Sequence, residues 1–191
     1  MAVRHHLTVR DDGQRNVILI APGIETAMRG SIIVKGSDNR IVIGPGCQAT
    51  DLYMEIGSSC SVTVGHSCGL GNLFVYASQD NIVEIGDNTG FGGTVRLLLH
   101  EPGGIKIGAG CLFASEIDVS ISDMHSIIDT ETGRRVNPAA NVLVEDRVWI
   151  GVRAMLLKGS HVQEGSIVGA RAVVCGLIPK NSVAAGSPAR V

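Results

Sequence analysis

Residues 144–178 read VEDRVWIGVRAMLLKGSHVQEGSIVGARAVVCGLI, and an aliphatic side chain returns in this stretch at every sixth position. The recurring residues are Val144, Ile150, Leu156, Val162, Val168 and Val174. Four places after each lies a mostly small residue, in the order Val148, Ala154, Ser160, Ser166, Ala172 and Ile178. A short fixed period of this kind is typical of solenoids, in which each repeat packs on its neighbours.

The spacing of the two positions predicts short strands with one common inward face. The small residue of one hexad and the large residue of the next are two apart, so both point to the same side of a strand. Glycine often follows the large residue, as in Ile150-Gly151 and Val168-Gly169, and it lets the chain turn closely. Three such sides make one triangular coil of a parallel β-helix, an all-β fold.

The first half of the chain carries the same signature with longer coils. Ile43, Val64, Ile85 and Ile107 each precede a glycine and are separated by 21, 21 and 22 residues, more than the eighteen of three hexads. The excess falls in turn-rich segments that we expect to bulge from the corners. We therefore expect one domain over residues 1–191, with a lead-in at 1–16 and about eight or nine coils from residue 17 to about 186.

Composition restricts the classes of function. The net charge is −2 and the basic residues are scattered, so the sequence lacks the basic patch that binding of nucleic acid requires. The N-terminal residues lack the apolar stretch of a secretion signal, and no unbroken apolar run is long enough for a membrane span. Cys47, Cys60, Cys68 and Cys111 fall at the small inward position, one in each coil. A zinc site needs paired cysteines, so we expect no metal, and unpaired thiols suit a reducing cytoplasm.

The run from Val144 to Gly151, continued through Val168-Gly169-Ala170 to the segment 184–191 (AAGSPARV), resembles the hexapeptide-repeat acyltransferases. It is most similar to the subgroup that acetylates sugars and polysaccharides, over residues 17 to 191. The resemblance implies a left-handed β-helix, acetyl-CoA as donor, and a homotrimer with active sites between subunits. Handedness rests on the resemblance alone, because crossovers between parallel strands are otherwise right-handed.

The hexad rhythm breaks between Ile107 and Val144, and the polar segment ISDMHSIID (residues 121–129) lies inside the gap. The glycine, proline and charges that follow predict a protruding loop over residues 126–141. Acetyl transfer to an alcohol requires a base for the hydroxyl proton, and free imidazole, with a pKa near 6.5, suits that task. The resemblance identifies His125 as the general base. Trp149, 24 residues later, is a candidate catalytic-site residue that would supply its indole N–H or pack beside the acetyl group, and an aromatic wedge at a coil corner is the structural alternative. We assign the other histidines to solvated surface.

Further site residues follow from the resemblance and from charge. The acceptor for the second ring nitrogen of His125 is Glu116, Asp118, Asp123 or a backbone carbonyl. The resemblance places CoA on Gly151, Val152, Gly169, Ala170 and Arg190. The Thr-Lys common in the family near the end is absent here, so Lys158 or Lys180 is the candidate replacement for the phosphate-binding lysine. Arg134 and Arg135 are a candidate contact for an anionic sugar, and solvated loop charge is the alternative.

These patterns predict an O-acetyltransferase that modifies a hydroxyl of a sugar or of a bacterial surface polysaccharide such as capsule or lipopolysaccharide, including polymers that contain sialic acid. The rival within the same chemistry is an N-acetyltransferase for an amino sugar, and a xenobiotic or serine acetyltransferase is more distant. A rival of another class is a non-catalytic scaffold or a carbonic-anhydrase-like protein, which would hold zinc through three histidines.

Overall fold

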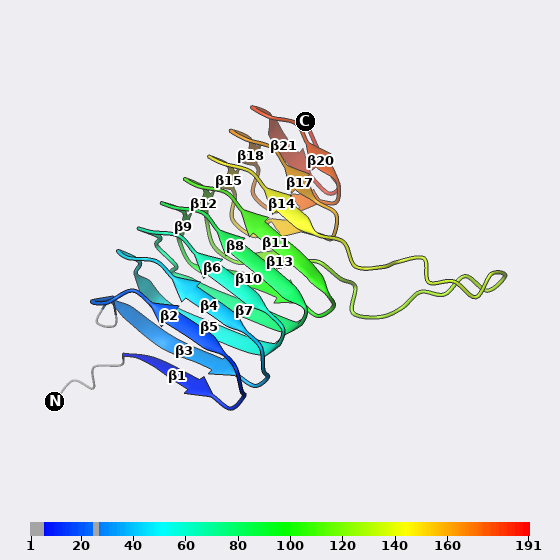
Figure 1. Cartoon of the computed structure of the whole chain (residues 1–191). Helices are drawn as coiled ribbons and strands as arrows, with labels where there is room; N and C mark the ends of the chain where they lie inside the picture. Colours follow the sequence, from blue (N-terminus) through cyan, green and yellow to red (C-terminus); the bar gives the residue numbers. More distant parts are fainter. Residues whose placement is uncertain (1–5, 25–26) are drawn as a thin grey trace.

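The computed structural model describes residues 6–24 and 27–191, and these form a triangular prism of stacked coils (Figure 1). The chain visits three sheets in turn, which we call A, B and C, and the first three described coils contribute strands to sheets A and B alone. The described residues contain no helix, so none is present that would be long and apolar enough to cross a membrane. The all-β parallel helix that the hexads predict is confirmed.

Three sheets make the sides of the prism. Across the described ranges, sheet A has eight strands: β1 (Leu7–Asp11), β3 (Met28–Val34), β5 (Ala49–Ser58), β7 (Asn72–Gln79), β10 (Thr94–Leu99), β13 (Ile117–Ser120), β16 (Met155–Leu156) and β19 (Val173–Val174). Sheet B likewise contains β2 (Val17–Ile20), β4 (Arg40–Ile43), β6 (Ser61–Val64), β8 (Asn81–Ile85), β11 (Gly103–Ile107), β14 (Val142–Val144), β17 (His161–Val162) and β20 (Leu177–Ile178). Sheet C contains β9 (Gly90–Phe91), β12 (Leu112–Phe113), β15 (Trp149–Ile150), β18 (Ile167–Val168), β21 (Val183–Gly186) and β22 (Ala189–Arg190).

Parallel pairing between equivalent strands of successive coils holds the prism together. Trp149 and Ile150, for example, lie in register with Leu112 and Phe113 on one side and with Ile167 and Val168 on the other. The last strand differs, because β22 turns back and pairs antiparallel with β21, with Ala185 opposite Arg190. Each coil therefore depends on its neighbours for its main-chain hydrogen bonds.

The interior is filled by the two residue positions that the hexads predict. Val144, Ile150, Leu156, Val162, Val168 and Val174 are each at most 1% exposed. Small residues at the second position donate to main-chain carbonyls of the next coil, as Ser160 Oγ does to Val174 O (2.9 Å) and Ser166 Oγ does to Pro179 O (2.6 Å). These bonds satisfy carbonyls that the tight corners would otherwise leave buried without a partner.

The cysteines predicted to face inward are buried. Cys47, Cys60, Cys68 and Cys111 are all 2% exposed or less, and burial raises the pKa of the Cys60 and Cys111 thiols. The Sγ atoms of Cys47 and Cys68 lie 3.2 and 3.3 Å from the carbonyl oxygens of Gly65 and Gly86, the corner glycines of the following coils. These thiols thus take the same role as Ser160 and Ser166.

The start of the helix differs from the sequence-based boundary. Residues 1–16 were expected to be a lead-in, but β1 already pairs with β3 at the edge of sheet A, with Val9 opposite Ile32. The hexad pattern misses this strand because no aliphatic-glycine corner follows it and because Val9 is 44% exposed. Residues 1–5 of the expected lead-in lie outside the described residues.

Candidate active site

A long loop leaves the prism at the corner between sheets A and B, where the chain passes from β13 to β14 (Figure 1). Its outer part is a narrow hairpin, because Ile128 and Arg135 form an antiparallel bridge and Val136 N donates to Ile127 O at 2.9 Å. Asp129 Oδ1 accepts from the main chain of Thr132 (2.7 Å) and closes the turn at the tip. The protruding loop predicted at 126–141 is confirmed, and the excursion already begins after Ser120.

The base of this loop is built around Asn137. Its side chain is only 8% exposed. The Oδ1 atom accepts from Ile127 N (2.6 Å), and Nδ2 donates to Asp123 Oδ2 and to the carbonyl oxygen of His125, both at 2.8 Å. Lys158, one coil further along, binds Asp123 Oδ2 at 2.5 Å. Asn137 therefore fixes the main chain on both sides of His125.

A second anchor ties the hairpin to the preceding coil. Arg135 makes a two-bonded ion pair with Glu101, at 2.5 and 2.7 Å, and Ser122 Oγ also donates to the Glu101 carboxylate. These donors, Arg135 first, lower the pKa of Glu101 from 4.5 to about 2. The carboxylate is stabilised in the folded state, so the anchor contributes fully above pH 4.5 and is lost as the pH falls through about 2.

We predict that Glu101→Gln loosens the loop without unfolding the prism. Removing the charge weakens the charge-assisted hydrogen bonds from Arg135 and Ser122, so tryptic cleavage after Arg134 and Arg135 should become about tenfold faster. Mass spectrometry of timed digests would locate the cuts. Glu84→Gln is the control, because it breaks an exposed pair with Lys106 on sheet B. Equal cleavage rates in the two variants would contradict the anchoring role.

His125 is exposed, and within the described residues its side chain has no hydrogen-bond or ion-pair partner. The three carboxylates considered as its acceptor pair elsewhere: Glu116 with Arg153, Asp118 with Arg96 and Asp123 with Lys158. The ring nitrogens of His125 are thus open to a substrate or to groups from another molecule. Its main chain is held by Asn137, so the position of the ring is restrained although the ring itself is free.

Trp149 lies on the outer face of sheet C, 52% exposed. It belongs to a ladder of apolar side chains in register on successive strands: Leu112, Trp149, Ile167 and Val183. The positions that the resemblance assigns to CoA lie next to this ladder, at the corner between sheets C and A. Gly151 and Val152 follow β15, and Gly169 and Ala170 follow β18. Arg190 is exposed on β22 and donates only to the carbonyl of Ala189 (3.0 Å). One surface of the chain therefore carries Trp149 and the adjacent corner residues.

Close stacking of the coils explains the glycine at this corner. A Cβ on Gly151 would lie 2.6 Å from the backbone nitrogen of Ala170, a distance that real Cβ atoms do not show. A Cβ on Gly169 would meet the Cβ of Ala185 at 3.0 Å. The small residues here satisfy the packing of the coils and also leave the corner free of side chains that would obstruct an extended ligand.

A single chain does not bring His125 and Trp149 together. The loop with His125 leaves the corner between sheets A and B, whereas Trp149 faces outward from sheet C, the opposite side of the prism. Of the two loop arginines, Arg135 is held by Glu101, and the side chain of Arg134 has no partner in the described part of the chain. A site that uses both His125 and Trp149 therefore needs a second copy of the chain.

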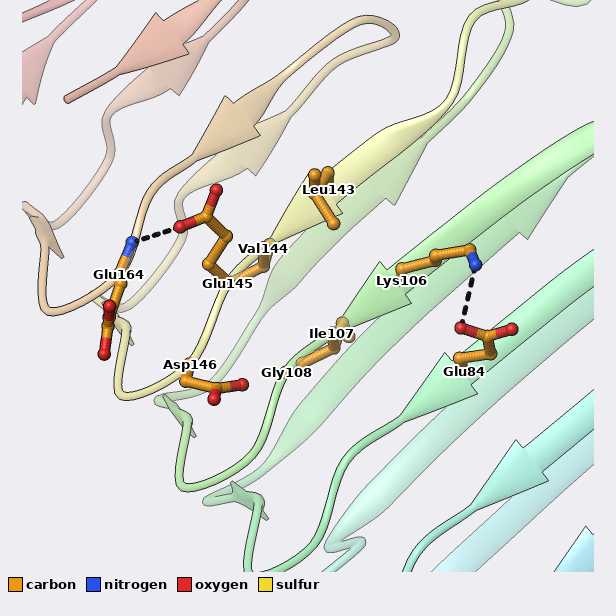
Figure 2. A pocket seen from close by; sticks show the side chains of 9 residues that line it. All are labelled: Glu84, Lys106, Ile107, Gly108, Leu143, Val144, Glu145, Asp146 and Glu164. Carbon is orange, nitrogen blue, oxygen red and sulfur yellow. Dashed lines mark hydrogen bonds and ion pairs between the residues drawn. The ribbon is translucent and has the colours of Figure 1, made fainter. Parts of the chain in front are cut away.

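The corner between sheets B and C carries an acidic hollow of about 340 Å³ (Figure 2). Glu145 accepts from Glu164 N at 3.0 Å and from His161 Nε2 at 2.6 Å, and Lys106 pairs with Glu84 on the neighbouring strand (Figure 2). His161, assigned to solvated surface from the sequence, is thus half-buried beside a carboxylate. Within the described residues no three His, Cys, Asp or Glu side chains converge to hold a metal ion. Sequence reasoning missed this hollow because its residues come from four different coils.

No family model matches the chain. The WbbJ protein of Escherichia coli K12, whose name assigns it to O-acetyl transfer in lipopolysaccharide biosynthesis, is 30% identical over 147 residues, which cover 73% of this chain and 74% of that protein. The chain belongs to the hexapeptide-repeat acyltransferases. The family that the resemblance of the C-terminal coils predicts is thereby confirmed.

Two more members of the family support this placement. The polysialic acid O-acetyltransferase of Neisseria meningitidis is 27% identical over 129 residues, which cover 67% of this chain and 60% of that protein. The crystal structure of the polysialic acid O-acetyltransferase OatWY is 25% identical and superposes with a TM-score of 0.83, covering 97% of this chain and 87% of that one.

A second solved structure supports the fold. The polySia-specific acetyltransferase NeuO superposes with a TM-score of 0.87 over 96% of this chain and 84% of that one, at 23% identity. The left-handed parallel β-helix is thereby confirmed. By sequence, the chain matches 60% and 38% of the length of two polysialic acid O-acetyltransferases, from N. meningitidis and from Escherichia coli O1:K1.

Proposed function

We propose that the chain is an acetyl-CoA-dependent O-acetyltransferase that modifies a hydroxyl of a bacterial surface polysaccharide, with polysialic acid as the first candidate acceptor. The observation that carries the proposal is the similarity to named polysaccharide O-acetyltransferases, by sequence over most of the chain and by fold over nearly all of it. The exposed imidazole on an anchored loop supports it, because acetyl transfer to an alcohol needs a base.

In the proposed reaction His125 acts as the general base. Its free ring nitrogen accepts the proton of the attacking hydroxyl as the new C–O bond forms at the thioester carbonyl. The C–S bond then breaks, and the CoA thiolate takes the proton from the imidazolium. Asn137 contributes by holding the backbone of His125, which restrains the direction from which the ring approaches the acceptor.

The site is proposed to form between subunits of a homotrimer. His125 and Trp149 face opposite sides of one prism, so the loop of one copy must reach the outer face of sheet C on another. The acetyl-CoA arm would follow the corner with Gly151, Val152, Gly169 and Ala170. Arg171, Lys180 and Arg190 are exposed cations at that end of the prism. The five unpaired cysteines suit a cytoplasmic enzyme.

Arg134 is the proposed contact for an anionic acceptor on the loop. Its guanidinium has no partner in the described residues, whereas that of Arg135 is committed to Glu101. Both were candidates from the sequence. We therefore assign acceptor attraction to Arg134 and loop anchoring to Arg135.

Purified protein should transfer acetyl groups from acetyl-CoA to polysialic acid and yield an ester. Transfer is measured by free thiol release and by the mass gain of the polymer, and mild alkali should remove the new acetyl groups. Glucosamine is the matched amine acceptor. Alkali-resistant acetylation of glucosamine, with no ester formed on the polymer, would support the N-acetyltransferase rival and contradict the proposal.

A further inference from the structure

The N-terminal coils carry a polar groove at the corner between sheets C and A. Two hollows of about 550 and 460 Å³ adjoin there, and both are lined by Arg29 and Thr50. Gln48 and Gly69 also line the first hollow, and His6 and Asp51 also line the second. The groove lies on the early coils of the prism, whereas Trp149 and the corner assigned to CoA lie on later ones.

The floor of the first hollow includes Gly69, a glycine that the fold does not require. Gln48, Gly69 and Gly90 are bridged in parallel and continue the outer ladder of sheet C, which in later coils carries Leu112 and Trp149. A Cβ on Gly69 would meet no atom within 4 Å, and one on Gly90 would meet only Leu112 Cδ2 at 3.5 Å. Neither glycine adopts a positive φ. Their effect is to leave the main chain open to a ligand.

The walls carry polar groups with no partner of their own. Within the described residues, the Arg29 guanidinium has neither an ion pair nor a hydrogen bond, and the side chains of Gln48 and Thr50 have no hydrogen bond. Most other arginines are paired with a carboxylate, namely Arg10, Arg15, Arg96, Arg135, Arg147 and Arg153. Asp51 and His6 are the other titratable groups, and both line only the second hollow. The first hollow thus has a single free positive charge.

We propose that this groove is a second binding site for the acceptor, in which Arg29 binds a sugar carboxylate of an anionic polysaccharide away from the site of transfer. A guanidinium can form two parallel hydrogen bonds to a carboxylate. Gln48 and Thr50 supply an amide and a hydroxyl for sugar hydroxyls, and the glycine floor lets a flat sugar ring lie against the main chain. The assignment of a polysaccharide ligand rests on the proposed function.

Direct binding of polysialic acid tests the groove without acetyl-CoA. Migration of the native protein through gels that contain polysialic acid gives a Kd, and gels with neutral dextran give the background. Arg29→Gln removes the charge, and Gly69→Leu places in the open floor the side chain that Leu112 has in a later coil. Each should raise the Kd for polysialic acid about tenfold or more, since a charged hydrogen-bond pair is lost or the groove is blocked.

Two variants serve as matched controls. Arg40→Gln removes an exposed arginine from the outer face of sheet B, and Gly176→Leu adds a side chain at another glycine with no atom within 4 Å of its would-be Cβ. Both should leave the Kd within about twofold of that of the unmodified protein. Thermal unfolding of all four variants shows whether the prism is intact.

The inference is overturned if the unmodified protein migrates equally in polysialic acid and dextran, or if Arg29→Gln and Gly69→Leu bind polysialic acid as the controls do. This assay needs no turnover, so it remains decisive if no acetyl transfer is found. Acetyl transfer to a short sialic acid oligomer by the unmodified protein tests the proposed function separately.

Discussion

Replacing His125 with alanine is expected to lower kcat for acetyl transfer by about 10²–10⁴-fold, with little change in the KM for acetyl-CoA. The hydroxyl of the acceptor would lose the group that takes its proton, while the surfaces proposed to bind the donor stay intact. The side chain is exposed and unpaired in the described chain, so its removal breaks no hydrogen bond or ion pair there. Stopped assays of thiol release, with light scattering to verify that the oligomer persists, would measure the effect.

His66→Ala is the control for this substitution. His66 is also exposed, at 52%, and pairs with Asp87 on a corner of the early coils, far along the chain from the loop. Its replacement should leave kcat within about twofold. A near-normal kcat in His125→Ala would show that His125 is not the general base. An equal loss of kcat in His66→Ala would show that the effect arises from general disturbance of the fold.

Mixed oligomers of His125→Ala and Trp149→Ala chains are expected to recover activity that neither variant has alone. If each site takes its histidine from one subunit and its tryptophan from the next, every mixed trimer contains one intact pair and should show about one third of the normal turnover. Co-expression of the two chains with different affinity tags, followed by purification on both tags, isolates the mixed species for the acetyl-transfer assay.

The same experiment separates a shared site from one built within a chain. Mixed oligomers of two differently tagged His125→Ala chains must remain inactive, which controls for the tags and the purification. If His125 and Trp149 of one subunit acted together, no mixed trimer of the two variants would contain an intact pair. Activity no higher than that of the His125→Ala control would then refute the intersubunit arrangement, which we propose from the positions of the two residues on opposite sides of the prism.

The interior of this fold was predictable from the sequence because each buried position is specified locally. The six aliphatic residues from Val144 to Val174 and the small residues between them point inward as the alternation of a short strand dictates. The loop was predictable because it interrupts that rhythm. β1 was not, since one strand with an exposed valine and no corner glycine contains too little of the repeat to be distinguished from an irregular segment.

The contacts of the candidate site were not predictable, because they join residues from different coils. Arg135 looks the same in sequence as its neighbour Arg134, yet it is held by Glu101, 34 residues earlier, across one coil of the helix. Lys158 was considered as a phosphate-binding replacement and instead binds Asp123 at the base of the loop. The partner of each of these side chains depends on how far each coil is extended by its corner inserts, which a six-residue period does not specify.

The backward turn of the last strand has a consequence for solubility. A solenoid exposes unpaired amide and carbonyl groups at both ends, and such edges invite chains to join end to end into fibres. β22 covers the final strand of sheet C in the antiparallel sense, so an incoming parallel coil finds no matching edge there. At the other end, β1 ends with the charged residue Asp11 and is followed by Asp12. Parallel stacking of another coil on this edge of sheet C is thereby blocked.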